Sequence, residues 1–256
     1  MSPLSMPAIA AHRGWHEDGA PKNSIAALEA AAARPGVQQV EIDVRRLGDE
    51  TMVVVHDPAI DGRPLASMRF ADLAHYPNVP TLEQWSRRAG ELGIGALVEL
   101  KETGYEAAAL DVVHRFVPAE RIDAFSFHHA AVVAMRAERP TMPVGLLTVG
   151  PTDGSALDGA RLVDEARSVD ATFVGVPTTQ ASDDVLEAAS TAGLGVTVWP
   201  NGPDERLEQL IADPRVTTVI TDQPAESIAQ RTLAFGSGAA DGSIAVRLLR
   251  TAGAMR

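Results

Sequence analysis

The chain has 256 residues, of which 45% are hydrophobic and 22% are charged, as in an ordinary globular protein. Its formal net charge is −12 and it contains no cysteine. The lack of cysteine excludes disulfides, zinc–thiolate sites and thiol nucleophiles, and the acidic balance argues against nucleic acid as the main partner, because phosphate backbones attract basic surfaces.

No segment has the composition of a secretory leader or a membrane span. The N-terminal stretch MSPLSMPAIAAHRG has neither a basic start nor a long apolar run. No other stretch approaches the ~18 apolar residues that a membrane-spanning helix needs. We therefore expect a cytoplasmic protein with no integral membrane segment.

Short strand-like runs alternate with alanine-rich helical runs along the chain. Nine runs have the composition of strands: 7–12, 37–44, 51–57, 95–101, 121–127, 142–149, 171–177, 194–200 and 216–222. Helical patterns between them include 24–35, 81–92, 182–193 and 203–214. Asn23 or Ser24 is the expected cap of the first helix, and Ser182 and Gly193 are the start and stop signals of the third. Strands that alternate with helices predict parallel βαβ units.

The strands 37–44 and 51–57 are too close in sequence to be parallel neighbours. A parallel crossover needs a dozen or more connecting residues, so these two strands should form an antiparallel hairpin with its turn near Gly48 and Asp49. Removing the return strand leaves eight, the number in a TIM barrel. The predicted fold class is therefore α/β, a (β/α)8 TIM barrel with an antiparallel hairpin extension after the second strand.

The barrel is predicted to be one domain over residues 1–233, because no low-complexity block or linker divides residues 7–230. Residues 234–256 differ, since they open with glycine, serine and alanine and later carry arginine without acidic balance. We expect this C-terminal tail to be either flexible or docked on a partner subunit. The sequence leaves open whether the protein forms an oligomer.

Polar side chains interrupt the predicted strands. His12 and Arg13 end the first strand, Glu41 and Asp43 share one face of the second, and Glu99 lies in the apolar run ALVELK. An isolated Glu-x-Asp also fits a solvated edge strand, but here the flanking residues are those of a buried strand. A buried acid is costly unless it is paired or binds a cation, and three carboxylates suit Mg²⁺ or Ca²⁺.

The predicted hairpin also brings a histidine toward these acids. A register symmetric about residues 49 and 50 would place His56 opposite Asp43. His12, Arg13 and His56 would then border the carboxylates at one mouth of the barrel, where barrel enzymes build their active sites.

An ordered series of motifs resembles the glycerophosphodiester phosphodiesterase family. The series is HRG at 12–14, P-x-N-S at 21–24, EID at 41–43, VVHD at 54–57 and VELK at 98–101, followed by PTLEQ at 80–84, SF at 126–127, VWPN at 198–201 and VITDQP at 219–224. The likeness covers about residues 8–230. It implies a TIM barrel in which Glu41, Asp43 and Glu99 hold a Mg²⁺ or Ca²⁺ ion.

The resemblance also implies roles for the remaining polar residues. His12 and His56 would be the general acid–base pair, Arg13 would contact the phosphate, and Lys101 and Trp199 would bind substrate. The implied reaction converts a small glycerophosphodiester into glycerol 3-phosphate and an alcohol. In relatives the attacking group is thought to be a neighbouring hydroxyl of the glycerol, which gives a cyclic phosphate that water then opens.

Two departures from the family pattern concern the substrate. The chain has Pro21-Lys22-Asn23 where the family commonly has Pro-Glu-Asn, and the segment 58–80 is compact where the family tends to carry a longer insertion. A shorter insertion predicts a more open pocket or a different head group. Two other functions therefore stay open: a lysophospholipase D-like or other phosphodiesterase on the same scaffold, and a decayed barrel that only binds.

The other polar candidates are expected to be structural. His16 should be a solvated loop residue, the pair His128 and His129 should begin a helix at the surface, and His75 and His114 should be helix or loop residues. Asp222 is expected to cap the final helical segment, with a role in the pocket left open.

Overall fold

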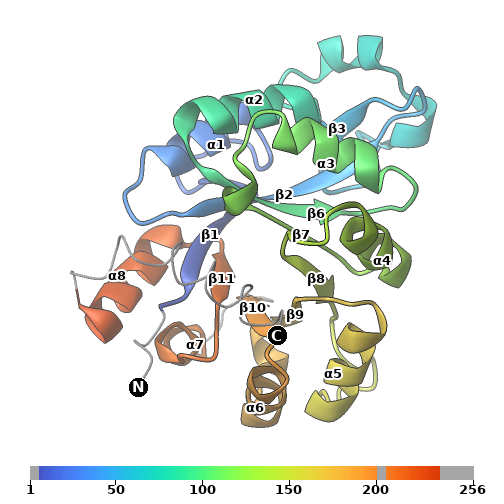
Figure 1. Ribbon diagram of the computed structural model, residues 1–256. Coiled ribbons are helices and arrows are strands. Elements are labelled where there is room, and N and C mark those ends of the chain that lie inside the picture. Colours follow the sequence, from blue (N-terminus) through green and yellow to red (C-terminus); the bar gives the residue numbers. More distant parts are fainter. Residues whose placement is uncertain (1–5, 201–205, 237–256) are drawn as a thin grey trace.

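The computed structural model describes residues 6–200 and 206–236, in which eight parallel strands close into a barrel (Figure 1). The barrel strands are β1 (Ala8–His12), β2 (Gln39–Arg46), β6 (Gly95–Leu100), β7 (Ile122–Ser126), β8 (Val144–Leu147), β9 (Phe173–Pro177), β10 (Gly195–Trp199) and β11 (Thr218–Thr221). They follow one another around the ring, and β1 closes it by pairing with both β2 and β11. The predicted TIM barrel is confirmed.

The predicted hairpin is also present, but its register differs by one residue. β3 (Met52–Val54) pairs antiparallel with β2 at the edge of the sheet, with Val44 opposite Val54. Asp43 therefore faces Val55, whose backbone N–H donates to the Asp43 carbonyl at 2.9 Å. The prediction that His56 lies opposite Asp43 is wrong. The cause is the turn, which centres on residue 49 because Glu50 adopts a positive φ of 68°.

The helices lie outside the ring of strands (Figure 1). They are α1 (Ile25–Ala32), α2 (Leu82–Leu92), α3 (Glu106–His114), α4 (His129–Glu138), α5 (Gly159–Ser168), α6 (Asp183–Thr191), α7 (Leu207–Ala212) and α8 (Pro224–Phe235). Two expected start signals are confirmed, since the side chains of Ser24 and Ser182 each accept a backbone N–H in the first turn, and Thr81 does the same for α2. Gly193 follows α6 with a φ of +75°, as expected of a stop signal.

Alternation along the strands separates two buried layers. Val40, Ile42 and Val44 of β2 belong to the large apolar layer between strands and helices. The opposite faces of the strands point into the barrel, where Phe125, Phe173 and other side chains form a smaller apolar cluster. This interior layer is also the one to which Glu41 and Asp43 belong by alternation.

The segment between β3 and α2 is folded over the hairpin. It contains the short strands β4 (Ala59–Ile60) and β5 (Arg63–Pro64), which pair antiparallel. Leu65 and Met68 from this segment are buried against Leu47 and Val53 of the hairpin. The compact segment thus stabilises the hairpin through its own small core.

α8 packs at the seam of the barrel, where β1 pairs with β11. The buried Arg231 of α8 donates to the carbonyl oxygens of Pro7 and Gly36, each at 3.1 Å. α8 continues through Phe235, and residues 237–256 of the predicted tail lie outside the described residues. Within the described ranges, no helix has the length and apolar character that crossing a membrane requires.

Candidate active site

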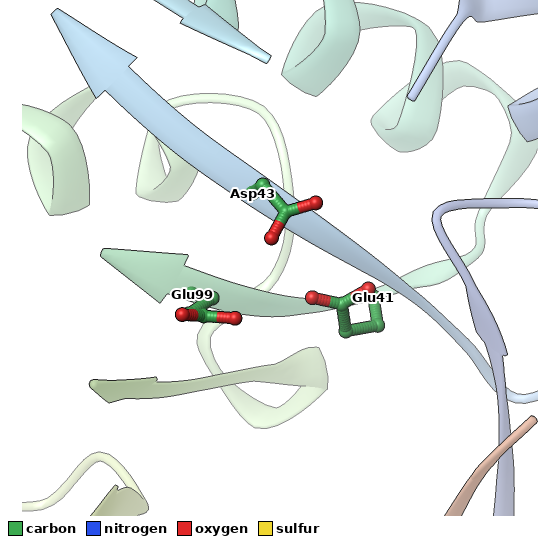
Figure 2. Close-up of side chains that lie close together, drawn as sticks. All are labelled: Glu41, Asp43 and Glu99. Carbon is green, nitrogen blue, oxygen red and sulfur yellow. The ribbon is translucent and has the colours of Figure 1, made fainter. Parts of the chain in front are cut away.

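Three carboxylates converge at the carboxyl end of β2 and β6. Glu41, Asp43 and Glu99, hereafter the acidic trio, lie close together on these neighbouring strands (Figure 2). Each offers a carboxylate oxygen within 4.8 Å of the others, and all three residues are buried. The three acids that the sequence singled out are therefore brought together by the register that pairs Asp43 with Glu99.

The acidic trio has the charge and chemistry of a divalent cation site. Burial and the neighbouring Asp43 and Glu99 carboxylates raise the pKa of Glu41 well above its usual range. Burial also raises the pKa of Glu99, against the opposing effect of the Lys101 ammonium. Burial and mutual repulsion make it unfavourable for these three carboxylates to be ionised together. Oxygen ligands arranged in this way fit a hard cation of the Mg²⁺ or Ca²⁺ class, so the trio could hold a metal ion.

Two cations border the trio on the side of Asp43. Arg13 Nε lies 3.0 Å from Asp43 Oδ2, and Lys101 Nζ lies 2.9 Å from Asp43 Oδ1 and 2.7 Å from Glu99 Oε1. Burial raises the pKa of Asp43, but the charges of Lys101 and Arg13 outweigh burial and lower it overall. Asn23, one of the two expected caps of the first helix, donates from Nδ2 to Asp43 Oδ2 at 2.9 Å.

Glu41 carries the charge that these cations leave uncompensated. Within the described part of the chain, it has no ion pair with a lysine or arginine, and His12 Nε2 lies 4.0 Å from its carboxylate. Three carboxylates beside two cations leave one negative charge in excess. An added divalent cation would complement this excess.

His12 and Arg13 reach the site through a tight turn at the end of β1. Arg13 and Gly14 have φ angles of 58° and 91°. A Cβ at Gly14 would lie 2.6 Å from the Cβ of Ala27, so glycine is needed where this turn packs against α1. The turn points the backbone N–H of Arg13 at Glu41 Oε2, 3.1 Å away, and thereby fixes His12 and Arg13 beside the acidic trio.

His12 is paired on the ring nitrogen that faces away from the trio. Its Nδ1 lies 2.8 Å from Asp222 Oδ1 at the end of β11. Burial lowers the pKa of His12, although the hydrogen bond with Asp222 opposes that shift. The lowered pKa favours a neutral imidazole near pH 7, which can accept a proton.

His56 occupies a more open position on the loop after β3. Its side chain is 42% exposed, and its Nδ1 lies 2.8 Å from Oδ1 of the adjacent Asp57. Its backbone carbonyl accepts a hydrogen bond from Arg45 Nε at 2.7 Å, which ties the loop to β2. The backbone of His56 is thus tied to the hairpin, whereas its imidazole contacts the adjacent Asp57.

Trp199 lies at the end of β10, among apolar side chains. It packs against the interior cluster and makes an edge-to-face contact with Phe127, with ring centroids 6.0 Å apart. The neighbouring pair His128 and His129 begins α4, as expected. His128 additionally lies within 3.1 Å of the Lys101 carbonyl, on the exposed rim.

Asp222 is the polar residue whose place the sequence predicted least well. It does not cap α8, whose N-cap position is Gln223. Its Oδ1 instead lies 2.8 Å from His12 Nδ1, 2.9 Å from His16 Nε2 and 3.1 Å from Lys22 Nζ. His16 is therefore not a solvated loop residue. The position of Asp222 directly after the strand that pairs with β1 is the signal that could have placed it beside His12.

Comparisons with known proteins agree with this architecture. YhdW of Bacillus subtilis is 25% identical over 237 residues, which cover 84% of this chain and 94% of that protein. A glycerophosphodiester phosphodiesterase from Parabacteroides distasonis superposes with a TM-score of 0.74 at 27% identity, over 89% of this chain and 99% of that one. An Oleispira antarctica phosphodiesterase, solved with the product sn-glycerol-3-phosphate, superposes with a TM-score of 0.73 at 22% identity. The match covers 88% of this chain and 96% of that one.

The family model extends over nearly all of the described barrel. The glycerophosphoryl diester phosphodiesterase family matches residues 12–226, from His12 at the end of the first strand into the last helix. This match confirms the resemblance seen in the ordered motifs. The chain belongs to the glycerophosphoryl diester phosphodiesterase family of phosphoric diester hydrolases.

Proposed function

We propose that this protein is a metal-dependent glycerophosphodiester phosphodiesterase that releases glycerol 3-phosphate and an alcohol by histidine acid–base catalysis. The observation that carries the proposal is the buried acidic trio with its uncompensated negative charge, bordered by His12, Arg13 and Lys101. The related barrel from Oleispira antarctica, which binds sn-glycerol-3-phosphate, supports the choice of product.

Glu41, Asp43 and Glu99 would hold the divalent cation, either Mg²⁺ or Ca²⁺. When bound, the ion would supply positive charge that offsets the charge of the phosphodiester. Arg13, fixed at the edge of the trio by its ion pair with Asp43, would contact the phosphate from the same side. Lys101 would keep Asp43 and Glu99 ionised and would add positive charge to the phosphate pocket.

His12 and His56 would move the protons. A neutral His12 can take a proton from the attacking hydroxyl, and a protonated histidine can give one to the departing alkoxide. By resemblance, the attacker is a neighbouring hydroxyl of the substrate glycerol, so that the first step forms a cyclic phosphate and expels the alcohol. Water then opens the ring, with the two histidines exchanging roles.

The rest of the chain would serve this single site. Residues 1–233 would form the catalytic domain, with 234–256 as a separate tail, and Trp199 would line the substrate pocket. The substrate would be a small phosphodiester.

A lysophospholipase D-like activity is the second candidate, favoured by the rim of the barrel. Phe127 and Val149 follow β7 and β8 at the carboxyl end and are 40% and 62% exposed, and Trp199 stands at the end of β10. These side chains form an apolar rim on the catalytic face. Such a rim would suit the acyl chain of a lysophospholipid.

The deciding experiment removes the metal and restores it. The protein is stripped with a chelator, returned to Mg²⁺ or Ca²⁺, and assayed on a panel of glycerophosphodiesters and lysophospholipids with the released alcohol as the measured product. We expect activity to disappear on stripping and to return with one of the two ions. Asp18→Asn, at an exposed pair with Arg34, serves as a control that should behave as wild type.

Two results would count against this function. Hydrolysis that survives complete chelation would remove the role of the acidic trio. A His12→Ala variant with full activity would remove the acid–base pair and return the decayed barrel to consideration. Release of the alcohol from soluble diesters but not from lysophospholipids would favour the glycerophosphodiester function, and the reverse would favour the lysophospholipase D-like one.

A further inference from the structure

One carboxylate oxygen at the seam of the barrel lies within hydrogen-bond distance of three side chains. Asp222 Oδ1 lies 2.8 Å from His12 Nδ1, 2.9 Å from His16 Nε2 and 3.1 Å from Lys22 Nζ. Asp222 and His12 are 210 residues apart in sequence. β1 and β11 pair in register, with Ala11 beside Thr221, so the barrel itself places residue 222 next to residue 12.

We propose that Asp222 is a positioning residue for His12, which fixes the tautomer and the orientation of the imidazole so that Nε2 presents its lone pair to the reacting phosphodiester. The inference rests on the proposed function and deepens it, because it says which nitrogen of His12 exchanges the proton.

The geometry decides the tautomer. An ionised carboxylate can only accept, so the ring nitrogen 2.8 Å from Asp222 Oδ1 must carry a proton. Nε2, on the other side of the ring, is 4.0 Å from Glu41 Oε2, beyond hydrogen-bond distance. In neutral His12 the proton therefore sits on Nδ1 and the lone pair on Nε2, at the edge of the acidic trio.

Other groups keep Asp222 ionised and in place. Burial raises the pKa of Asp222, but hydrogen bonds from His12, Lys22 and His16 outweigh burial and hold the pKa far below its usual range. The Lys22 ammonium and the His16 imidazole both come from the loop after β1, so the same loop that follows His12 also restrains its partner. Lys22 thus has a structural reason to stand where the family commonly has glutamate.

The other imidazole has no comparable support. His56 pairs with Asp57, the next residue in the chain, whose side chain is 75% exposed. That pair lies within a single loop, whereas His12 and Asp222 follow two paired barrel strands. The contrast indicates that the protein fixes the orientation of His12 in advance of substrate binding.

The first test measures the tautomer directly. Protein labelled with ¹⁵N-histidine is studied by NMR in the wild type and in Asp222→Asn, which preserves the shape of the side chain and removes its charge. We expect the wild type to show His12 protonated on Nδ1 alone, and the variant to shift toward the Nε2–H form. An unchanged tautomer in Asp222→Asn would overturn the proposal.

The second test separates turnover from binding. In metal-loaded enzyme, Asp222→Asn should lower kcat by about 10- to 100-fold, less than the loss at a fully buried triad aspartate, because Asp222 is half exposed. KM should change by less than about threefold. A rise in KM with unchanged kcat would overturn the proposal and make Asp222 a substrate contact.

Three further variants sharpen the test. Asp222→Glu keeps the carboxylate and should recover most of the kcat lost in Asp222→Asn. Lys22→Met and His16→Gln each remove one neighbour of Asp222 but leave the His12 contact, so each should have a smaller effect than Asp222→Asn. A Lys22→Met defect larger than that of Asp222→Asn would assign the role to Lys22 instead.

The NMR result stands apart from the enzymatic one. If the wild type hydrolyses none of the phosphodiesters tried, the proposed function fails, while the tautomer comparison still decides whether Asp222 orients His12.

Discussion

Two regions of the barrel interior differ in the chemistry of their inward-facing side chains. On the side of β2 and β6, the inward positions hold Glu41, Asp43 and Glu99. On the side of β7, β8 and β9, the inward cluster contains Phe125, Leu147 and Phe173. Both sets of residues follow the same alternation along parallel strands, so the difference lies in side-chain chemistry alone.

The apolar half stabilises the barrel, and the charged half costs stability. Phe173 is packed so closely against Gly145 that a Cβ at that glycine would lie 2.1 Å from its ring. Glu41 is equally well buried but has a raised pKa and no lysine or arginine partner within the described chain. The comparison teaches that one barrel interior combines buried carboxylates that disfavour folding with closely packed apolar side chains that favour it.

The largest expected effect is the loss of activity in Glu41→Gln. The amide keeps the shape of the side chain but removes the charge that a divalent cation would complement, so kcat/KM should fall by about 1000-fold or more, as expected when metal-derived charge stabilisation of several kcal/mol is lost. Ion affinity, measured by calorimetric titration, should fall with it. Activity within tenfold of wild type would show that the charged half does not serve catalysis.

The exposed residue Glu91 gives a matched control for this variant. It lies on α2, outside the ring of strands, in an ion pair with Arg88. Glu91→Gln should retain wild-type activity and ion affinity, because the charge it removes is solvated.

The next effect is a loss of stability in Phe173→Ala, on the apolar wall. The ring is 6% exposed and packs edge-to-face on Phe125, so its removal should lower the free energy of unfolding by about 3–5 kcal/mol. Denaturant unfolding measures this change. Activity per folded molecule should stay close to wild type, since the acidic trio is untouched.

Phe70 supplies the control for this second variant. It is 57% exposed, so Phe70→Ala should change the free energy of unfolding far less than Phe173→Ala does. Equal losses at the two positions would mean that packing on the apolar wall is not what stabilises the barrel.

The smallest expected effect is a pH dependence of the stability cost at Glu41. Its pKa is raised in the folded protein, so its favourable contribution is complete below the unfolded value of ~4.3 and is lost as pH rises through the raised value. In ion-free protein, Glu41→Gln should therefore gain stability over wild type between about pH 5 and about pH 8, by an amount on the order of 1 kcal/mol.

Thermal or denaturant unfolding of both proteins at the two pH values measures this difference. The difference in free energy of unfolding between variant and wild type cancels the contributions of His12 and the other titrating groups that act independently of Glu41. Saturating Mg²⁺ or Ca²⁺ should remove the advantage of the variant, because an ion binds the ionised carboxylate. A variant that gains nothing as pH rises would contradict an uncompensated Glu41.

Much of the fold and part of the site could be predicted from the sequence. The eight strands and the hairpin followed from spacing, because a connection as short as 45–50 cannot cross between parallel strands. The acidic trio followed from strand periodicity, because acids inside apolar runs are rare without a reason. Both signals are local to a few residues, and the structure confirms the barrel, the hairpin and the proximity of the three acids.

The rest depended on details that a linear pattern does not carry. The hairpin register slipped by one residue because the turn uses a positive φ at Glu50, and the position of His56 changed with it. The partnership of Asp222 with His12 depends on which strands close the ring, and the convergence of His16 and Lys22 depends on the path of a loop. The roles of His56, Arg13, Lys101 and Trp199 remain proposals for the experiments above.

The seam between β1 and β11 has a consequence for how the protein is made. The β11 side of β1 can be completed only after the ribosome has synthesised residue 221, and Arg231 then fastens the seam at Pro7. Until that moment, His12 lacks Asp222 and one edge of β1 is open to other strands. A nascent chain would therefore lack the complete site and be prone to aggregate, and chaperone protection would matter most just before the last strand is added.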